Sequence, residues 1–330
     1  IESIEADAQA SVPGSEVDVL SAPVLLQSVN PSLQEQLPSQ ARIERGNTGG
    51  QPGGEVPQTP EPEPEPDPRA VEQLTEIVDL LNQASMGLTR AAVEEFQELG
   101  AEDWFEAQKN TAQTLHYPLL AAVSNAPTMV ERLDVWMRVS LSAEDQLRQR
   151  VAFALSQLLV VSDKDTLANQ QLALAHYYDL LARHSLGNYR DLLTEVTLHP
   201  VMGEYLSMKG NQKENLALNI RPDENYAREL LQLFSLGTAR LDDWGRTIED
   251  RNGMELATYS QADIESLARI LTGWHFSNAE RFNYPNQQNW LEPMEPFEDY
   301  HDTKEKIVSF CPTFPAGQSA HQDLNAAIDC

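Results

Sequence analysis

The chain has 330 residues and a formal net charge of −28 at pH 7, with 51 acidic side chains against 23 basic ones. A charge of this size repels nucleic acid phosphates and anionic lipid surfaces, so we expect no nucleic acid partner. The sequence contains no run of about 18 apolar residues, and it therefore predicts no transmembrane segment.

Residues 1–69 predict an acidic, extended tail. They contain twelve acidic residues, three arginines and eleven of the 20 prolines. The segment TPEPEPEPDP (59–68) alternates proline with acid, which favours polyproline II because proline fixes φ and has no N–H to donate. The one apolar patch, VLSAPVLLQSV (19–29), is either a strand that docks on another surface or a disordered segment that makes non-specific apolar contacts. A segment of this composition cannot bury enough apolar surface to fold alone, so we expect it to be disordered or ordered by a partner.

From residue 70 onward, apolar residues recur with a period close to 3.6, and no alternation typical of strands interrupts them. This pattern predicts an all-α domain over 70–330 with long loops, one of them at 239–258. Serines followed three positions later by aspartate are typical of helix N-termini. Two such pairs, each before an apolar helical stripe, are Ser142 with Asp145 and Ser260 with Asp263.

The segment RPDENYARELLQLFSLG (221–237) predicts a helix over 222–236 with a polar start. Proline suits the first helical position, and glycine is typical of a helix end. Five polar side chains near this start are candidate catalytic groups, namely Arg221, Glu224, Asn225, Arg228 and Glu229. Their i, i+4 spacings are compatible with exposed ion pairs on a well-capped helix, or with a polar cleft at a rigid helix start.

Histidines supply the other candidate groups. His199 lies before a proline, which holds it in an extended conformation, and it is either a structural histidine or a general base or metal ligand. A set of His199, Glu229, His275 and His301, with Glu224 as a further carboxylate, would suit a divalent metal ion. No recognised ligand spacing such as HExxH is present, so the metal hypothesis rests on residue type alone.

The two cysteines, Cys311 and Cys330, lie close together in the sequence. An even count in an exported protein predicts a disulfide, whereas two buried thiols would be typical of a cytosolic one. We expect the disulfide, which would close a short loop and stabilise the fold by about 3 kcal/mol.

Four segments resemble a bacterial family catalogued as domain of unknown function 1800. They are RPDENYARELLQLFSLG, QLRQRVAFALSQLLVVSD (146–163), TLHPVMGEYLSMKGNQ (197–212) and YSQADIESLARILTGWHF (259–276). The resemblance covers about 71–330 and brings no established reaction. It implies an exported protein, often encoded beside a second exported family. In the resembled family a further helical half follows, so we expect the domain to be incomplete at its C-terminus and completed by that half or by another protein chain.

Two classes of function remain open from the sequence. The first is an exported cell-envelope protein, periplasmic, cell-surface or extracellular, that acts as a non-catalytic subunit of a surface or extracellular assembly. The alternative is an envelope enzyme, a metal-assisted hydrolase or an oxidoreductase, with its polar site at the start of the predicted 222–236 helix. A buried, solvent-reachable cleft with convergent polar groups would favour the enzyme, and a dry network of ion pairs with no pocket beside it would favour the subunit.

Overall fold

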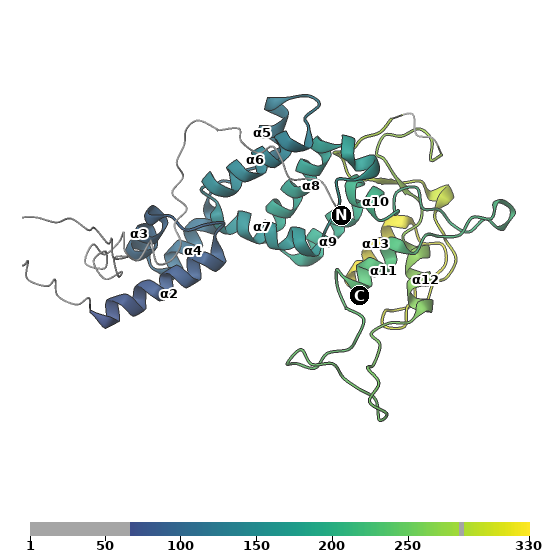
Figure 1. The fold of residues 1–330 in the computed structure, drawn as a ribbon. Coiled ribbons are helices and arrows are strands. Elements are labelled where there is room, and N and C mark those ends of the chain that lie inside the picture. The colour runs from purple at the N-terminus through teal and green to yellow at the C-terminus, as the bar shows by residue number, and fades with distance from the viewer. Residues whose placement is uncertain (1–66, 284–286) are drawn as a thin grey trace, which may run out of the picture. The chain divides into compact units, whose positions relative to one another are not determined.

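In the computed structural model of the chain, the described residues are 67–283 and 287–330. This part of the chain contains twelve α-helices, α2 to α13, and one sheet of two short strands (Figure 1). The predicted all-α fold class is confirmed. No helix in the described part is long and apolar enough to cross a membrane. Residues 1–66, which make up nearly all of the predicted tail, lie outside the described residues.

The chain divides into two compact units, with the boundary between Ala107 and Gln108. The first unit holds α2 (Pro68–Ala84), α3 (Arg90–Leu99) and most of α4 (Ala101–Asn110). The Thr89 hydroxyl accepts from the Ala92 backbone N–H at 3.1 Å and caps α3. Buried apolar residues of α2 and α3 pack together, so this short unit has its own small core.

The second unit begins with four helices. They are α5 (His116–Val123), α6 (Met129–Ser142), α7 (Gln146–Leu158) and α8 (Gln171–His184), with a 3-10 turn, η2 (Asp165–Asn169), before the last. Helix α8 packs against α5, α6, α7 and the following helix α9. It buries residues on several faces, including Ala175, Leu180 and Leu181, as expected of a helix that is surrounded by protein. Polar side chains on α8 are therefore held inside the unit.

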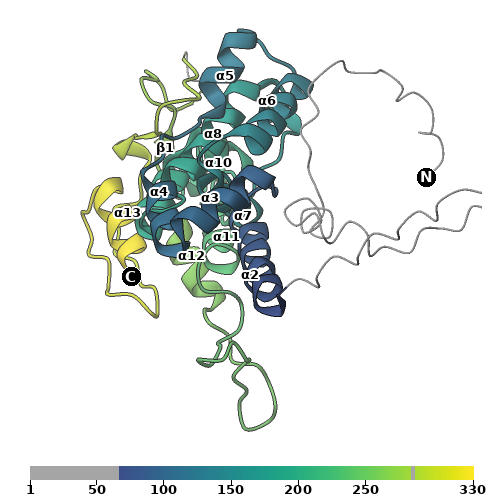
Figure 2. The same cartoon turned by 90° about the vertical axis from the view of Figure 1, so that its left-hand side faces the viewer.

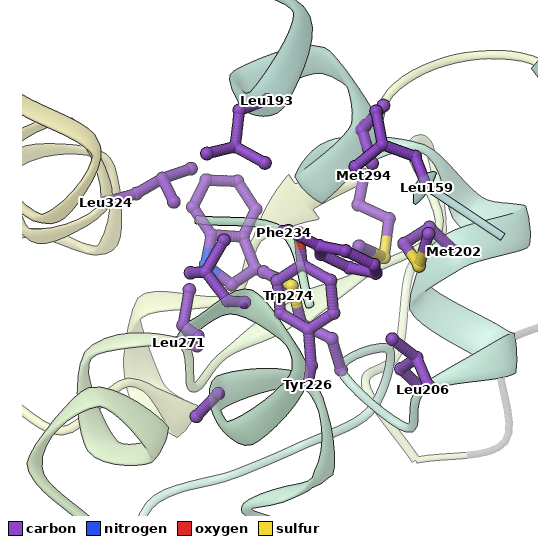
Figure 3. Packing of buried hydrophobic residues seen from close by; sticks show 14 of the residues in the cluster. Leu159, Leu193, Met202, Leu206, Tyr226, Phe234, Leu271, Trp274, Met294 and Leu324 are labelled. Carbon is purple, nitrogen blue, oxygen red and sulfur yellow. The ribbon is translucent and has the colours of Figure 1, made fainter. Parts of the chain in front are cut away.

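The remaining elements surround a second part of the core. They are α9 (Tyr189–Leu198), α10 (Pro200–Tyr205), η3 (Leu216–Leu218), α11 (Asn225–Gln232), α12 (Gln261–Ile270), β1 (Trp274–His275), β2 (Glu295–Pro296), η4 (Glu298–Tyr300) and α13 (Ala320–Asp329). Strands β1 and β2 pair antiparallel. Figure 3 shows Trp274, which is completely buried, among Leu193 of α9, Tyr226 of α11 and Leu324 of α13. This indole therefore joins helices that lie far apart in the sequence.

Helix α11 is shorter than the predicted 222–236 helix, which is a correction. The side chain of Asn211 holds the preceding backbone, because its Oδ1 accepts from the Asp223 N–H at 2.8 Å and its Nδ2 donates to the Asp223 carbonyl at 3.2 Å. The helix therefore begins at Asn225, and Pro222 lies before it rather than at its first position. It ends where the Leu231 carbonyl accepts from the N–H of Gly237 at 2.9 Å.

One of the two predicted capping pairs is also wrong. Ser142 is the last residue of α6, and its hydroxyl donates to the Arg138 carbonyl at 2.7 Å. Asp145 is buried and accepts from the Thr114 N–H at 3.0 Å and the Gln149 side chain at 3.1 Å. A long-range hydrogen bond therefore replaces the expected cap. Ser260 and Asp263, in contrast, form the predicted capping box of α12.

Residues 239–258, expected as a loop, form together with Thr238 a hydrogen-bonded projection that we call the arm (238–258). Figures 1 and 2 both show it extending away from the ends of α11 and α12. Three backbone hydrogen bonds close a ring across it, from Arg240 to Leu256, from Leu256 to Ile248 and from Ile248 to Arg240, at 2.8, 2.8 and 2.9 Å. The arm therefore has a defined backbone structure.

The same turn occurs twice in the arm. Asp242 Oδ1 accepts from two backbone N–H groups of its own turn, both at 2.9 Å, and Asp250 Oδ1 does the same at 2.8 and 3.0 Å. Each turn contains a glycine with positive φ, Gly245 at 77° and Gly253 at 78°. The Asp and Gly positions repeat after eight residues, so the sequence contains a short internal repeat that specifies both turns.

Candidate functional site

The predicted polar cluster at α11 forms a connection between two helices. Glu224 Oε2 accepts from Arg228 Nη2 and from Gln261 Nε2, both at 2.8 Å, and Arg228 also reaches Gln261 Oε1 at 3.4 Å. Because Gln261 is the first residue of α12, this network joins α11 to α12. The side chains of Arg228 and Glu224 are 39% and 34% exposed, so water screens their ion pair, which contributes about 1 kcal/mol or less.

A polar cleft of about 680 Å³ lies beside this network. Its charged lining residues are Glu214, Arg221, Glu224, Glu265, Arg269, Asp302, Lys304 and Glu305. Arg269 Nε donates to Asp302 Oδ2 at 2.7 Å. Burial raises the pKa of Asp302, but hydrogen bonds from Arg269 and the Lys304 backbone outweigh it and hold this pKa below its usual value. Arg221 and Glu224 therefore face a cleft that carries both signs of charge.

The other two candidates from the same segment, Asn225 and Glu229, do not line this cleft. Asn225 is exposed, and its backbone N–H donates to Asp223 Oδ1 at 2.8 Å. Glu229 lies one turn further on, and its Oε2 is a buried atom without a hydrogen-bond partner among the described residues. The five predicted groups are therefore split between the cleft, the helix connection, the interior and, for Asn225, the exposed surface.

His199 is paired with a second histidine that sequence reasoning missed. Its Nδ1 accepts from the Val201 N–H at 3.2 Å, which caps α10 and places the ring hydrogen on Nε2. That nitrogen lies 3.0 Å from Nδ1 of His176 on α8. Burial, followed by the charges of His176 and Arg183, lowers the pKa of His199 to about 3. Both rings border a cavity of about 460 Å³ that is separate from the polar cleft.

His275 lies in an aromatic environment. Its Nδ1 accepts from the Phe276 N–H at 2.8 Å, and its ring makes edge contacts with Phe276, Phe282 and Phe297. Burial, followed by the charge of Lys209, lowers the pKa of His275 to about 4. The imidazole is therefore a neutral part of the core at neutral pH.

His301 belongs to a buried triad with Lys306 and Asp323. Its Nδ1 lies 3.0 Å from the Thr272 carbonyl oxygen and its Nε2 lies 3.0 Å from Asp323 Oδ2. Lys306 Nζ donates to the same carboxylate oxygen. The side chains of His301, Lys306 and Asp323 are all completely buried. The triad fixes α13, which carries Asp323, to the segment before it.

The structure does not bring the four predicted metal ligands together. His199 contacts His176, His275 lies among phenylalanines and His301 contacts Asp323, while Glu229 lies on α11. Within 67–283 and 287–330, no group of three or more His, Cys, Asp or Glu side chains has an arrangement that could hold a metal ion. Each predicted histidine has a hydrogen-bond partner inside the protein instead.

A further pair, His116 and Asp179, was also missed by sequence reasoning. Asp179 of α8 accepts from the backbone N–H groups of His116 and Tyr117 at 2.6 and 2.8 Å, so a side chain from another helix caps α5. The residues are 63 positions apart, and no local motif connects them. The sequence contains a partial indication of a polar site on α8, because the spacing of His176, Asp179 and Arg183 places these three side chains on one face of the helix.

The predicted disulfide between Cys311 and Cys330 is present, with a Cα–Cα distance of 5.3 Å. It ties the end of α13 to the segment that carries Lys306 and Val308. Among the described residues no free cysteine is found. The triad therefore holds α13 near its N-terminal end, and the disulfide holds it at its C-terminal end.

Replacing both cysteines with serine is expected to lower the free energy of unfolding by about 3 kcal/mol, because the bridge restricts the unfolded chain. Urea unfolding of the non-reduced protein and of the Cys311→Ser/Cys330→Ser variant measures the difference. Reduced protein should unfold like the variant. Thiol titration of native protein should find no free thiol, and finding two would contradict the bridge.

The comparison with known proteins gives one finding. A family model described as "Protein of unknown function (DUF1800)" matches residues 79–330. No curated protein and no solved structure gives a match. The matched region contains the α11 segment, the His199 segment and α12, which carry the motifs that suggested the resemblance. Because the family model covers most of the sequence, the chain belongs to the DUF1800 family.

Proposed function

We propose that this chain is an exported cell-envelope protein that acts as a non-catalytic subunit of a surface or extracellular assembly, and that it binds another protein through the arm. The observation that carries the proposal is the apolar surface of the arm. Trp244, Met254 and Leu241 are 84%, 67% and 56% exposed. Single exposed apolar side chains are common, but a tryptophan and two large aliphatic side chains on one projection are typical of a binding element.

The backbone of the arm supports a role in binding. The ring of hydrogen bonds through Arg240, Ile248 and Leu256, together with the turns at Asp242 and Asp250, fixes the arm before any partner is bound. Backbone hydrogen bonds lower the pKa of both aspartates, so both stay ionised and keep accepting these bonds at neutral pH. A pre-ordered element loses less entropy on association than a flexible loop does.

The charge of the chain indicates which partner fits. Two copies would each carry −28, and an anionic membrane surface would be repelled as well, so neither is favoured. We therefore infer a different protein whose surface offers an apolar patch with basic residues around it. Export is supported by the disulfide, since such bonds persist in oxidising compartments.

The bonding of the predicted site supports a non-catalytic role. Glu224 and Arg228 connect α11 to α12 through Gln261, and His199 caps α10 while contacting α8. These are the bonds expected of residues that hold helices together.

The test uses a photo-crosslinking residue at position 244 in the cells that make the protein, followed by identification of the adduct and reconstitution with the purified partner. We expect one discrete adduct and a defined complex. Trp244→Ser should weaken that complex about 30-fold, as loss of a central tryptophan does. Asn252→Ser is the matched control, because Asn252 has the same place in the second turn, and it should bind like wild type.

Equal binding by wild type and Trp244→Ser, or the absence of any adduct at 244, would contradict the proposed role of the arm. Both readouts use the full chain, the first in the cells that make it and the second with the purified partner. Detection of the protein in the cytosol, with two free thiols, would contradict the proposed export separately.

The alternative, a metal-assisted hydrolase or an oxidoreductase of the envelope, has one observation in its favour. Arg221 and Glu224 line a polar cleft of about 680 Å³, a size suited to a small ligand. Metal analysis of protein from its native source separates the two functions. A stoichiometric transition metal would favour the enzyme over the assembly subunit.

A further inference from the structure

A third cavity, of about 580 Å³, lies between α5, α6, α7 and α8. Its lining is mainly apolar and includes Leu120, Trp136, Phe153, Leu174 and Leu181. Arg132 and Asp163, paired at 2.9 Å, also border it and satisfy each other's charge. A cavity of this size and lining is typical of sites for small organic molecules, in which a few polar groups fix the orientation of the ligand.

His116 provides such a polar group. It is 3% exposed, and its Nδ1 lies 3.1 Å from Asp179 Oδ1. Because a carboxylate accepts hydrogen bonds, Nδ1 carries the ring hydrogen of the neutral imidazole, and in this form Nε2 keeps a free lone pair. Nε2 is buried and has no hydrogen-bond partner within the described residues. A buried acceptor without a partner costs free energy, which a ligand with a donor can recover.

The placement of Asp179 indicates where this nitrogen faces. Asp179 lines the neighbouring cavity that contains His176 and His199, and it does not line the apolar one. The Nδ1 edge of the His116 ring, which is bonded to Asp179, therefore turns away from the apolar cavity. His116 itself lines that cavity, and we infer that the edge it presents there is the one that carries Nε2, which is not bonded to Asp179.

We propose that this cavity binds a small, mainly apolar molecule that carries a hydroxyl group, and that the hydroxyl donates to His116 Nε2. A carboxylate would meet an acceptor rather than a donor at this nitrogen, and an ammonium group would lose its hydration against apolar walls. Tyr178 lines the same cavity, and burial is the main cause that raises its pKa to about 12, so its hydroxyl remains uncharged. The ligand is therefore a neutral alcohol or phenol.

The experiment compares three probes that share one apolar body, namely 1-naphthol, naphthalene and 1-methoxynaphthalene. Only the first can donate a hydrogen bond. We expect 1-naphthol to bind about tenfold more tightly than the other two, the effect of one buried hydrogen bond. His116→Asn keeps an N–H that can reach Asp179 but removes Nε2, so it should bind all three probes equally. His184→Asn, outside the cavity, should keep the preference.

A second measurement on the wild-type protein removes the dependence on folding of the variant. The ¹⁵N resonance of His116 Nε2 should move on addition of 1-naphthol and stay in place on addition of naphthalene. No binding of any probe, equal affinity of the naphthol and its methyl ether, or an unmoved Nε2 resonance at saturation would each overturn the proposal. Loss of the preference in His184→Asn would do so as well, because it would show that the preference arises elsewhere.

Discussion

Replacing Lys306 with methionine is expected to lower the free energy of unfolding by about 3–5 kcal/mol, the range for breaking a buried ion pair. Lys306, Asp323 and His301 are completely buried, and Asp323 Oδ1 already has no hydrogen-bond partner among the described residues. The substitution would leave the buried carboxylate with His301 as its remaining side-chain donor. Urea unfolding monitored by far-ultraviolet circular dichroism gives the free energy.

Lys304→Met is the matched control for this substitution. Lys304 is exposed two positions earlier, and the same change there is expected to alter stability by about 0.5 kcal/mol or less. A double variant, Lys306→Met with Asp323→Leu, removes both charges and should be less destabilised than the single variant, because no unpaired charge is then buried. Equal losses for Lys306→Met and Lys304→Met would show that the triad does not stabilise α13.

The capping pairs show how far local sequence determines this fold. Ser260 and Asp263 form the predicted capping box, in which Asp263 Oδ2 accepts from the Ser260 N–H at 2.7 Å, while the distant Ser309 N–H donates to Oδ1 at 2.6 Å and leaves the cap in place. Ser142 and Asp145 have the same spacing, yet Asp145 binds Thr114, which lies 31 residues earlier. A local pattern is thus reliable only where tertiary contacts agree with it.

In the candidate site, too, contacts between near neighbours in the sequence could be predicted and contacts between distant residues could not. The helix connection through Glu224 and Arg228 is a local i, i+4 pair, and its spacing is visible in the sequence. The contacts of His199 with His176, and of His116 with Asp179, join residues 23 and 63 positions apart, so they depend on how α8 packs. Residue type alone suggested that the histidines share one metal site, but each is held by a different element.

The arm could have been predicted in part from the sequence. Its Asp and Gly positions recur after eight residues, which specifies the same turn twice, at Asp242 and at Asp250. A search for repeats of 20 to 50 residues does not detect so short a unit. The arm also needs backbone hydrogen bonds between the segments that carry Arg240, Ile248 and Leu256. Turn patterns in the sequence do not predict this pairing.

The protein is expected to lose stability as the pH falls from 7 to 5, and His199 is expected to account for about 2 kcal/mol of this loss. In the unfolded chain a histidine takes up a proton near pH 6.5. In the folded protein, burial and the charges of His176 and Arg183 lower the pKa of His199 to about 3. Between these values the unfolded state binds more protons than the folded one, so acid favours unfolding.

The size of the effect follows from that window. Each pH unit inside it costs about 1.4 kcal/mol for one histidine, and the interval from 6.5 to 5 therefore gives about 2 kcal/mol. Asp263 and Asp302 do not contribute, because their pKa values lie below the usual aspartate value and hence below this window. His176 and His275, whose pKa values are also lowered by burial, add losses of the same sign.

The variant His199→Asn isolates the contribution of His199. Asparagine is a good helix cap and can accept from the Val201 N–H as the imidazole does, but it does not titrate. Its stability should fall by about 2 kcal/mol less than that of wild type between pH 7 and pH 5. Asn188→Ala removes the cap of α9 without removing a titrating group, so it should lose about 1 kcal/mol at both pH values and keep the wild-type slope. If His199→Asn also kept the wild-type slope in urea unfolding at the two pH values, His199 would not be the buried neutral imidazole that responds to acid.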